Sequence, residues 1–228
     1  MIEECVHFHS DKLRLEGILT YNEDMQSSPA ILLCAPHPNL GGDMDNNVIT
    51  SIARVSVSMG FVSLRFNYRG VGNSECHIKG VAQRFQYWDT SLNGGDYTDA
   101  VADTHAALHF LVSQIGVTQE IFLAGYSFGA VAGMRVGAES KHVKAFASLS
   151  TPFGRYTLDF LQECKKSKLF IYSRNDFAAT AEDTLRGFEG LSSPKILELI
   201  EDSDHFYRGQ EDGLSQKVCA FFKLQINR

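Results

Sequence analysis

Short apolar runs alternate with segments of helical periodicity along most of this chain, and this alternation strongly constrains the fold. Residues 30–35 form a continuous apolar run, as expected for a strand that is buried on both faces. Apolar residues then recur at helical spacing, and Gly60 ends that helix before the next apolar run, residues 61–66. Because helical crossovers connect parallel strands, the pattern predicts a mostly parallel sheet with helices on both faces.

The alternation continues and predicts a doubly wound α/β fold with about eight strands. Residues 4–21 instead alternate apolar and polar side chains, which predicts an antiparallel hairpin ahead of the parallel strands. The chain has 228 residues, so residues 1–228 are predicted to form a single domain. The other predicted helices are 96–114, 128–138, 181–188 and 214–224, and the other predicted strands are 121–124, 143–149, 169–172 and 196–200.

Residues 76–95 do not fit this alternation. The segment is longer than a usual connection from strand to helix and carries Phe85, Tyr87 and the only tryptophan, Trp88. Long loops in compact domains are often functional, so one interpretation is a small lid or a pocket wall. The other, which we weigh equally, is that the aromatic residues form a satellite cluster of the core.

Composition and charge exclude several function classes. The chain has 44% hydrophobic and 21% charged residues, which is typical of a globular protein. With 27 acidic and 21 basic residues and a net charge of -6, nucleic acid is not an expected partner. The apolar runs are far shorter than the roughly 18 residues that span a bilayer. The acidic N-terminus does not resemble a signal peptide, so we expect no membrane span and a cytoplasmic location.

Neither the histidines nor the cysteines form a metal-binding pattern. His105 and His109 lie four residues apart on a predicted helix, but Ala106 replaces the glutamate of an HExxH motif. No cysteine or carboxylate pattern completes a site with His7 and His9. The five cysteines are scattered and fit neither a disulfide framework nor a zinc site. We therefore expect neither a metal nor a cofactor.

The motif Gly125-Tyr126-Ser127-Phe128-Gly129 matches the pattern GxSxG and lies between a predicted strand and a predicted helix. A serine at such a sharp turn projects its hydroxyl from the edge of the sheet, and the glycines leave room for the tight backbone. Small residues could also serve only to pack the helix closely on the strand. The placement between strand and helix favours the first interpretation, which makes Ser127 a nucleophile.

A serine nucleophile needs a base that titrates near neutral pH and an acid that orients the base. In this arrangement the acid and then the histidine follow the serine, each after a later strand. Asp176 and His205 satisfy that order, although Asp176 could instead be a turn aspartate that binds its own backbone. Asp159 is a weaker candidate for the acid. His142, the other downstream histidine, precedes a strand and is expected at the opposite edge.

Acyl transfer also requires two donors for the developing oxyanion. The amide of Phe128, directly after the serine, is the first. Pro36 and Pro38 have no N–H, so the second must come from His37 or, with a different bend of the loop, from Asn39. We favour His37.

The Gly125–Gly129 motif, with Asp176 and His205 in this order, resembles the α/β-hydrolase superfamily over nearly the whole chain. Further motifs are similar to a branch of small hydrolases without a cap domain, such as dienelactone hydrolases and prolyl-oligopeptidase-type catalytic domains. These motifs are Pro36-His37-Pro38, Gly41-Gly42-Asp43-Met44 with Asn47, and residues 65–75. The resemblance implies that Ser127, Asp176 and His205 form a catalytic triad. The segment 76–95 is longer and more aromatic than this branch leads us to expect.

The sequence therefore predicts a serine hydrolase of the carboxylesterase or thioesterase type, acting on a small-molecule acyl substrate through an acyl-enzyme. An acyltransferase or cyclase could use the same acyl-enzyme, and a non-catalytic binding module is the alternative from another class. The sequence leaves a homodimer open. Residues expected to line the substrate pocket are Asn39, Arg69, Phe85, Tyr87, Trp88 and Tyr126, although bracing of the loop is the favoured role for Arg69.

Overall fold

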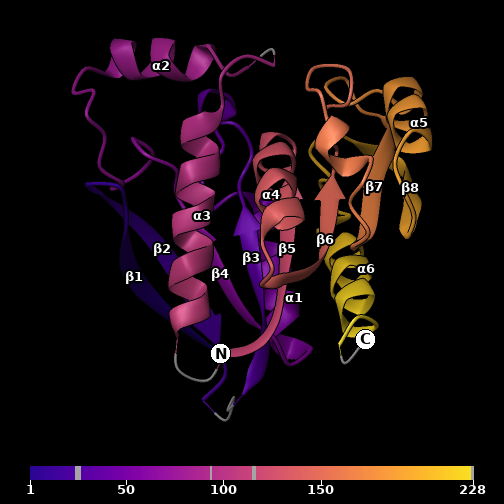
Figure 1. Ribbon diagram of the computed structural model, residues 1–228, viewed down its shortest axis with the longest axis horizontal. Helices are drawn as coiled ribbons and strands as arrows, with labels where there is room; N and C mark the ends of the chain where they lie inside the picture. Colours follow the sequence, from indigo (N-terminus) through magenta and orange to yellow (C-terminus); the bar gives the residue numbers. More distant parts are fainter. Residues whose placement is uncertain (24–26, 93, 115–116, 227–228) are drawn as a thin grey trace.

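The computed structural model describes residues 1–23, 27–92, 94–114 and 117–226, and its centre is one eight-stranded sheet (Figure 1). The strand order is β1-β2-β4-β3-β5-β6-β7-β8. β1 pairs antiparallel with β2 and β2 antiparallel with β4, whereas all the other neighbours are parallel. This confirms the predicted mixed sheet with its N-terminal hairpin. The strands are β1 (Ile2–Ser10), β2 (Leu13–Tyr21), β3 (Ser28–Cys34), β4 (Val62–Phe66), β5 (Val117–Tyr126), β6 (Val143–Leu149), β7 (Ser167–Asn175) and β8 (Lys195–Asp204).

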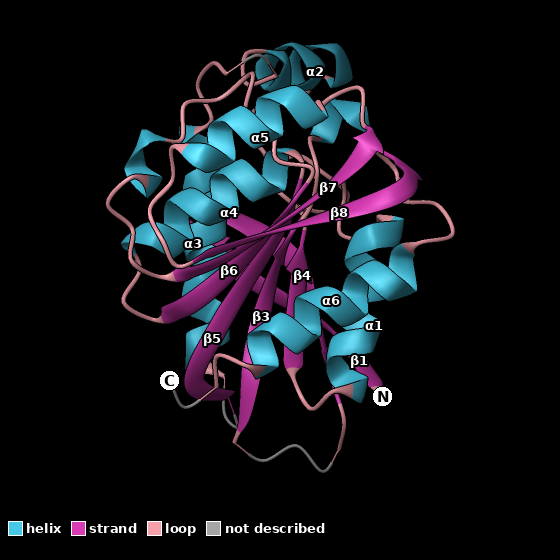
Figure 2. Cartoon of the chain, turned by 90° about the vertical axis from the view of Figure 1, so that its right-hand side faces the viewer, coloured by secondary structure: helices cyan, strands magenta, loops and turns pink. Residues whose placement is uncertain are grey.

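Helices cover both faces of this twisted sheet (Figure 2). α1 (Asn47–Ser58) and α6 (Glu211–Lys223) pack together on one face. α3 (Thr98–Ser113), α4 (Phe128–Glu139) and α5 (Ala181–Glu189) lie on the other. α2 (Val81–Asp89) and the short 3-10 helices η1 (Pro38–Leu40) and η2 (Asp159–Leu161) lie in connections between the larger elements. None of the helices that the structure describes is both long and apolar enough to cross a membrane.

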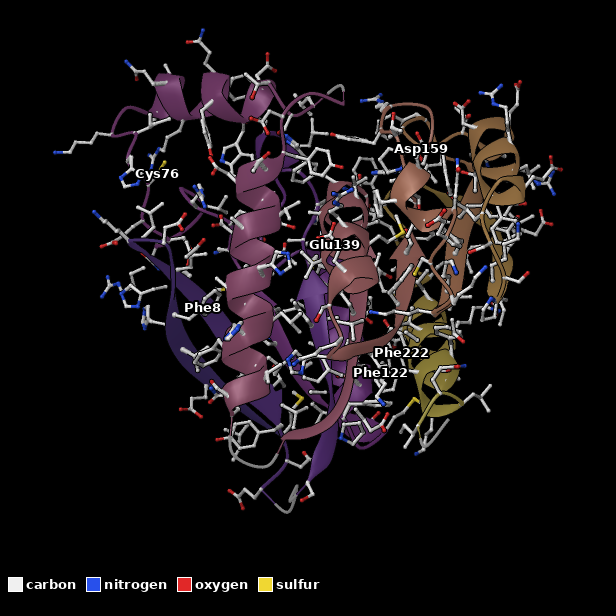
Figure 3. The ribbon with its side chains drawn as sticks, viewed as in Figure 1. Phe8, Cys76, Phe122, Glu139, Asp159 and Phe222 are labelled. Atoms are coloured by element: carbon white, nitrogen blue, oxygen red, sulfur yellow. The ribbon has the colours of Figure 1, made fainter. Side chains whose placement is uncertain are left out.

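Each central strand contributes side chains to two separate parts of the core. In β5, Leu123 belongs to the cluster under α3 and α4, whereas its neighbour Phe122 faces α6. The Phe122 ring stacks on Phe222 of α6 at a centroid distance of 4.9 Å (Figure 3). At the other end of the sheet, Phe8 of β1 stacks on Phe110 of α3 at 5.4 Å. Burial on both faces explains why the central strands read as continuous apolar runs.

Two strands extend further than their apolar runs predicted. β7 and β8 continue to Asn175 and Asp204, and these two residues pair with each other. The extensions carry polar side chains, including the exposed ion pair between Arg174 and Glu201, and such residues do not mark a strand by hydropathy. As a result, His205 follows β8 immediately, whereas the predicted strand 196–200 left residues 201–204 as a loop before it.

The segment 76–95 contains the helix α2, where we predicted a long loop. Val81, Phe85 and Trp88 recur at helical spacing, a signal that our interpretation of the segment did not use. Trp88 is buried in the large core cluster under α3 and α4, and Tyr87 packs against it, so these two residues do not form a separate satellite cluster. Phe85 is 55% exposed and Val81 is 75% exposed, so the first turns of the helix present apolar side chains to solvent.

Candidate active site

Ser127 forms the sharp turn between β5 and α4, with φ 55° and ψ -118°. A residue other than glycine at positive φ is strained, and such strain concentrates at functional sites. A Cβ atom on Gly125 would lie 2.3 Å from the carbonyl oxygen of Gly129, and one on Gly129 would lie 2.3 Å from that of Cys34. The amide of Ser127 also donates to the Leu149 carbonyl at 2.8 Å. The glycines therefore let this turn pack directly on β3, at the carboxyl ends of the parallel strands.

Asp176 and His205, which follow β7 and β8, are hydrogen-bonded to each other. Nδ1 of His205 lies 2.8 Å from Oδ1 and 2.9 Å from Oδ2 of Asp176. Oδ1 also accepts the amides of Ala178 and Ala179, each at 2.8 Å, so the turn interaction considered for Asp176 coexists with the histidine contact. The carboxylate can only accept, so Nδ1 of His205 carries the proton and Nε2 is left as the basic nitrogen.

The Asp176 carboxyl is held in its ionised form. Burial by itself raises its pKa, but the hydrogen bond and charge of His205, with hydrogen bonds from Ser150 and the Ala179 amide, bring the pKa below its ordinary value. An ionised carboxylate beside the imidazole stabilises the protonated ring and fixes its orientation.

Tyr126 connects the serine turn to the histidine. Its hydroxyl donates to the backbone carbonyl of His205 at 2.6 Å, and the two rings lie 5.4 Å apart. Because Tyr126 directly precedes Ser127, this bond brings the turn and His205 to the same edge of the sheet. The bonds that the described residues form do not include one between the Ser127 hydroxyl and His205. Tyr126 is itself buried with its hydroxyl engaged, and its role in lining the pocket stays a prediction.

Ser150 and Tyr207 are two further polar residues of this site that no sequence motif singled out. Their hydroxyls lie 2.8 Å apart, both residues have positive φ, and the Ser150 amide donates to Ile171. Burial raises the pKa of Tyr207 well above its ordinary value, which keeps its hydroxyl protonated. Ser150 directly follows β6, the strand beside β5. The rule that carboxyl ends of parallel strands share one edge would have found it.

His37 lies in the loop after β3 and is fully engaged. Its Nδ1 accepts the amide of Asn39 at 3.1 Å, while Nε2 donates to the Trp88 carbonyl at 3.1 Å and to the Ser91 hydroxyl at 2.9 Å. Its ring packs edge-on against Phe128 at 4.8 Å. The backbone amide of Asn39 is therefore occupied by the His37 ring. Of the two amides considered as the second oxyanion donor, the backbone amide of His37 is the one left without this bond.

Stability should depend on pH through His37. Burial lowers the pKa of His37 from 6.5 to about 4, against the smaller opposing effects of the Trp88 carbonyl and Asp89. Between pH 6.5 and pH 4, His37 is therefore protonated in the unfolded chain but still neutral in the folded protein. The free energy of unfolding should fall by up to about 3 kcal/mol as the pH falls through this range. Urea unfolding at pH 6.5 and 4.5 measures the effect. His37→Asn should show a smaller fall than wild type, and the exposed-site control His105→Asn should match wild type; equal falls in all three would contradict the prediction.

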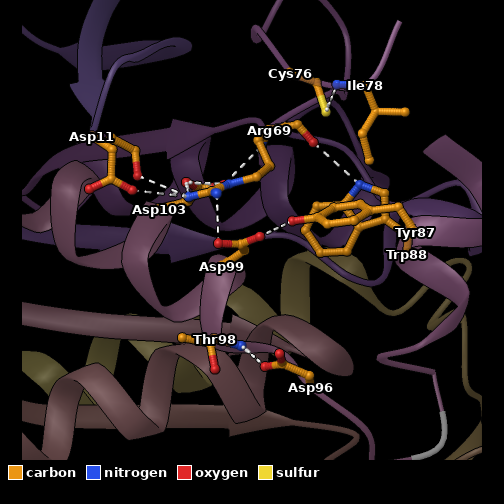
Figure 4. A network of polar contacts seen from close by, with 11 residues as sticks. Asp11, Arg69, Cys76, Ile78, Tyr87, Trp88, Asp96, Thr98, Asp99 and Asp103 are labelled. Carbon is orange, nitrogen blue, oxygen red and sulfur yellow. Dashed lines mark hydrogen bonds and ion pairs between the residues drawn. The ribbon is translucent and has the colours of Figure 1, made fainter. Parts of the chain in front are cut away.

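Arg69 braces this region through a buried ionic network (Figure 4). Its Nη2 lies 2.7 Å from Asp103, which is fully buried, and its Nη1 lies 2.6 Å from Asp99. Tyr87 donates its hydroxyl to Asp99, and the Trp88 indole N–H donates to the Arg69 carbonyl at 3.3 Å. Bracing was the favoured role for Arg69. The polar groups of Arg69, Tyr87 and Trp88 are thus used within the chain, and a role of these residues in lining the pocket stays a prediction.

Asn39 and Phe85 hold η1 against α2. The side-chain amide of Asn39 donates to the Phe85 carbonyl at 2.8 Å. Of the residues predicted to line the pocket, Phe85 is the one whose large side chain is exposed. Among the residues that the structure describes, His, Cys, Asp and Glu side chains form no group of three or more that could hold a metal ion.

Comparison with known proteins identifies the fold. No family model matches the chain. An uncharacterized protein of Rickettsia prowazekii is 26% identical over 222 residues, which cover 93% of this chain and 86% of that protein.

Several solved structures align over nearly their whole length. An α/β serine hydrolase homologue from Coxiella burnetii is 24% identical with a TM-score of 0.81, covering 97% of this chain and 98% of that one. A putative α/β hydrolase from Agrobacterium tumefaciens is 25% identical with a TM-score of 0.79, covering 99% and 97%. An α/β serine hydrolase without a lid from Xanthomonas campestris is 21% identical with a TM-score of 0.81, covering 99% and 96%.

The chain thus has the α/β-hydrolase fold. These structures support the resemblance to the α/β-hydrolase superfamily that the motifs indicated.

Proposed function

We propose that this protein is a serine hydrolase that cleaves a carboxylic ester or thioester through an acyl-enzyme. The observation that carries the proposal is the hydrogen-bonded pair of Asp176 and His205 at the same sheet edge as the strained Ser127 turn. The likeness of the fold to that of α/β serine hydrolases supports a hydrolase. Two structural neighbours point to ester substrates: the esterase domain of a protein from Rhodothermus marinus, and Est1E from Butyrivibrio proteoclasticus, which binds ferulic acid.

In the first half of the reaction, Nε2 of His205 accepts the Ser127 proton while the serine oxygen attacks the carbonyl carbon. The carbonyl electron pair moves to oxygen and forms a tetrahedral oxyanion. When this intermediate collapses, the bond to the leaving group breaks and His205 protonates the leaving atom. Water then repeats the sequence on the acyl-enzyme, with His205 again as base, and releases the acid and free Ser127.

The backbone amides of Phe128 and His37 stabilise the oxyanion in this proposal. Phe128 is the first residue of α4, so its amide has no partner within the helix and lies at the positive end of the helix dipole. The hydrogen bonds of the His37 ring fix the loop that carries the second amide. Preorganised donors of this kind act on charge that develops only in the transition state.

We also assign α2 as a wall of the site within a single domain. Asn39, Tyr87 and Trp88 bond α2 to η1, α3 and the loop after β4. Because these bonds fix α2 to its neighbours, they favour a role as a fixed wall and not as a mobile lid.

Intact-mass analysis after treatment with a fluorophosphonate tests the proposed function. We expect one covalent adduct on wild type and none on Ser127→Ala. A matched control is Ser150→Ala, a serine of the same edge, which should still be labelled. Folded wild-type protein that stays unlabelled would contradict the proposal and favour the non-catalytic binding module. If wild type takes the label, and unlabelled wild type supplied with an ester transfers the acyl group to an alcohol faster than to water, the protein is an acyltransferase instead.

A further inference from the structure

Two exposed phenylalanine rings lie against His205. Phe177 directly follows Asp176 and is 64% exposed, and Phe206 directly follows His205 and is 41% exposed. The ring centroids of Phe177 and Phe206 lie 5.2 and 5.8 Å from that of His205, and 5.8 Å from each other. We call these two side chains the aromatic ledge.

The backbone holds both rings in place. The amides that follow Phe177, those of Ala178 and Ala179, are bonded to Asp176. Phe206 donates its amide to Asp204 at 2.8 Å and accepts the side-chain amide of Asn47 at 3.1 Å. Adjacent large apolar side chains left in water on a fixed backbone mark a place where an apolar group binds.

The reaction determines which part of a substrate reaches the ledge. When the tetrahedral intermediate collapses, its bond to the leaving oxygen or sulfur breaks, and the electron pair stays on that atom. The atom takes its proton from Nε2 of protonated His205, so it must lie within hydrogen-bonding reach of this nitrogen. The group attached to the leaving atom is therefore the part of the substrate nearest the rings that contact His205.

We propose that the aromatic ledge, Phe177 and Phe206, is the subsite for an apolar leaving group. The substrates are then esters or thioesters of alkyl or aromatic alcohols or thiols. This inference rests on the proposed hydrolase function and extends it to a substrate class. Leu40 and Phe85 are exposed apolar residues of η1 and α2, whose backbones are hydrogen-bonded to His37 and Asn39, and we assign them to the acyl group.

Two series of esters test the assignment. Methyl, butyl and hexyl acetate vary only the leaving group, and the methyl esters of acetic, butyric and hexanoic acid vary only the acyl group. Each methylene that is removed from water favours binding by about fourfold. Because the ledge covers only one side of the alkyl group, we expect kcat/KM to rise at least about tenfold from methyl to hexyl acetate. Acid release at constant pH measures both series.

The variants separate the ledge from other apolar surfaces. Phe177→Ala and Phe206→Ala should each reduce the ratio of kcat/KM for hexyl over methyl acetate by about threefold or more, since half of the ledge, and so half of a tenfold effect on a free-energy scale, is lost. Their ratio of methyl hexanoate to methyl acetate should match wild type. Phe85→Ala and the exposed control Leu185→Ala should leave the alcohol-series ratio unchanged. Ratios within a series cancel any general loss of catalytic rate.

Labelling by a fluorophosphonate on the same samples distinguishes the two possible failures. If wild type is labelled but hydrolyses all members of the alcohol series at equal rates, the proposed leaving-group subsite is wrong and the proposed hydrolase function is retained. A chain-length effect in the alcohol series that disappears in Phe85→Ala, but persists in Phe177→Ala and Phe206→Ala, also overturns this subsite. Wild type without an adduct contradicts the hydrolase itself. A labelled Phe177→Ala variant with a flattened alcohol series supports the proposal.

Discussion

Asp176→Asn should lower kcat for ester hydrolysis by about four orders of magnitude without unfolding the protein. Oδ1 of Asp176 accepts two backbone amides, so the carbonyl oxygen of an asparagine would take that position. The asparagine nitrogen would then replace Oδ2, which lies 2.9 Å from Nδ1 of His205. It would donate to Nδ1, which places the imidazole proton on Nε2, and that nitrogen could no longer accept the Ser127 proton.

Steady-state hydrolysis of a p-nitrophenyl ester measures the loss, and circular dichroism checks the fold. The matched control is Asp159→Asn, at the aspartate that the sequence offered as the weaker candidate. Asp159 lies in η2, and its side chain accepts a hydrogen bond from Gln162. We expect this variant to keep the wild-type rate. A rate for Asp176→Asn within tenfold of wild type would refute the assignment of the acid.

The mixed sheet and its N-terminal hairpin could be predicted from the sequence because they follow local rules. The same rules placed Ser127, Asp176 and His205 after strands, but they did not give the strand order. Apolar runs mark strands that are buried on both faces, and the carboxyl ends of parallel strands share one edge. A serine motif at the carboxyl end of one strand therefore predicts that its polar partners lie at the carboxyl ends of other parallel strands. Asp176 and His205 were found in this way, and the structure joins them by a hydrogen bond.

The supporting contacts could not be predicted because they depend on tertiary packing. The hydroxyl of Tyr126 bonds a carbonyl 79 positions along the chain, and nothing in the motif indicates this partner. Aromatic residues of 76–95 resemble a pocket lining by composition, yet Trp88 packs into the core. Conversely, in the sequence Phe177 and Phe206 are ordinary apolar residues next to Asp176 and His205. Only the exposure of their side chains in the structure distinguishes them.

The buried ionic network should dominate the stability of the segment that carries His37 and α2. The guanidinium of Arg69 bonds both oxygens of Asp103, and the backbone amide of Arg69 also donates to this carboxylate at 2.9 Å. Asp103 is fully buried, so Asp103→Ala leaves a buried cation whose nearest remaining partner is Asp99.

Asp103→Ala should therefore lower the free energy of unfolding by about 3 to 5 kcal/mol. Urea unfolding measures this loss, with Glu201→Ala as the control. Glu201 pairs with Arg174 on the exposed surface, where water and salt screen the two charges, so its removal should change the free energy of unfolding far less than Asp103→Ala does. The double variant Arg69→Met with Asp103→Leu should recover much of the stability, because replacing both charges removes the uncompensated one. If Asp103→Ala cost no more than Glu201→Ala, the network would not be what holds α2 and His37 beside Ser127, and packing of Trp88 alone would have to do so.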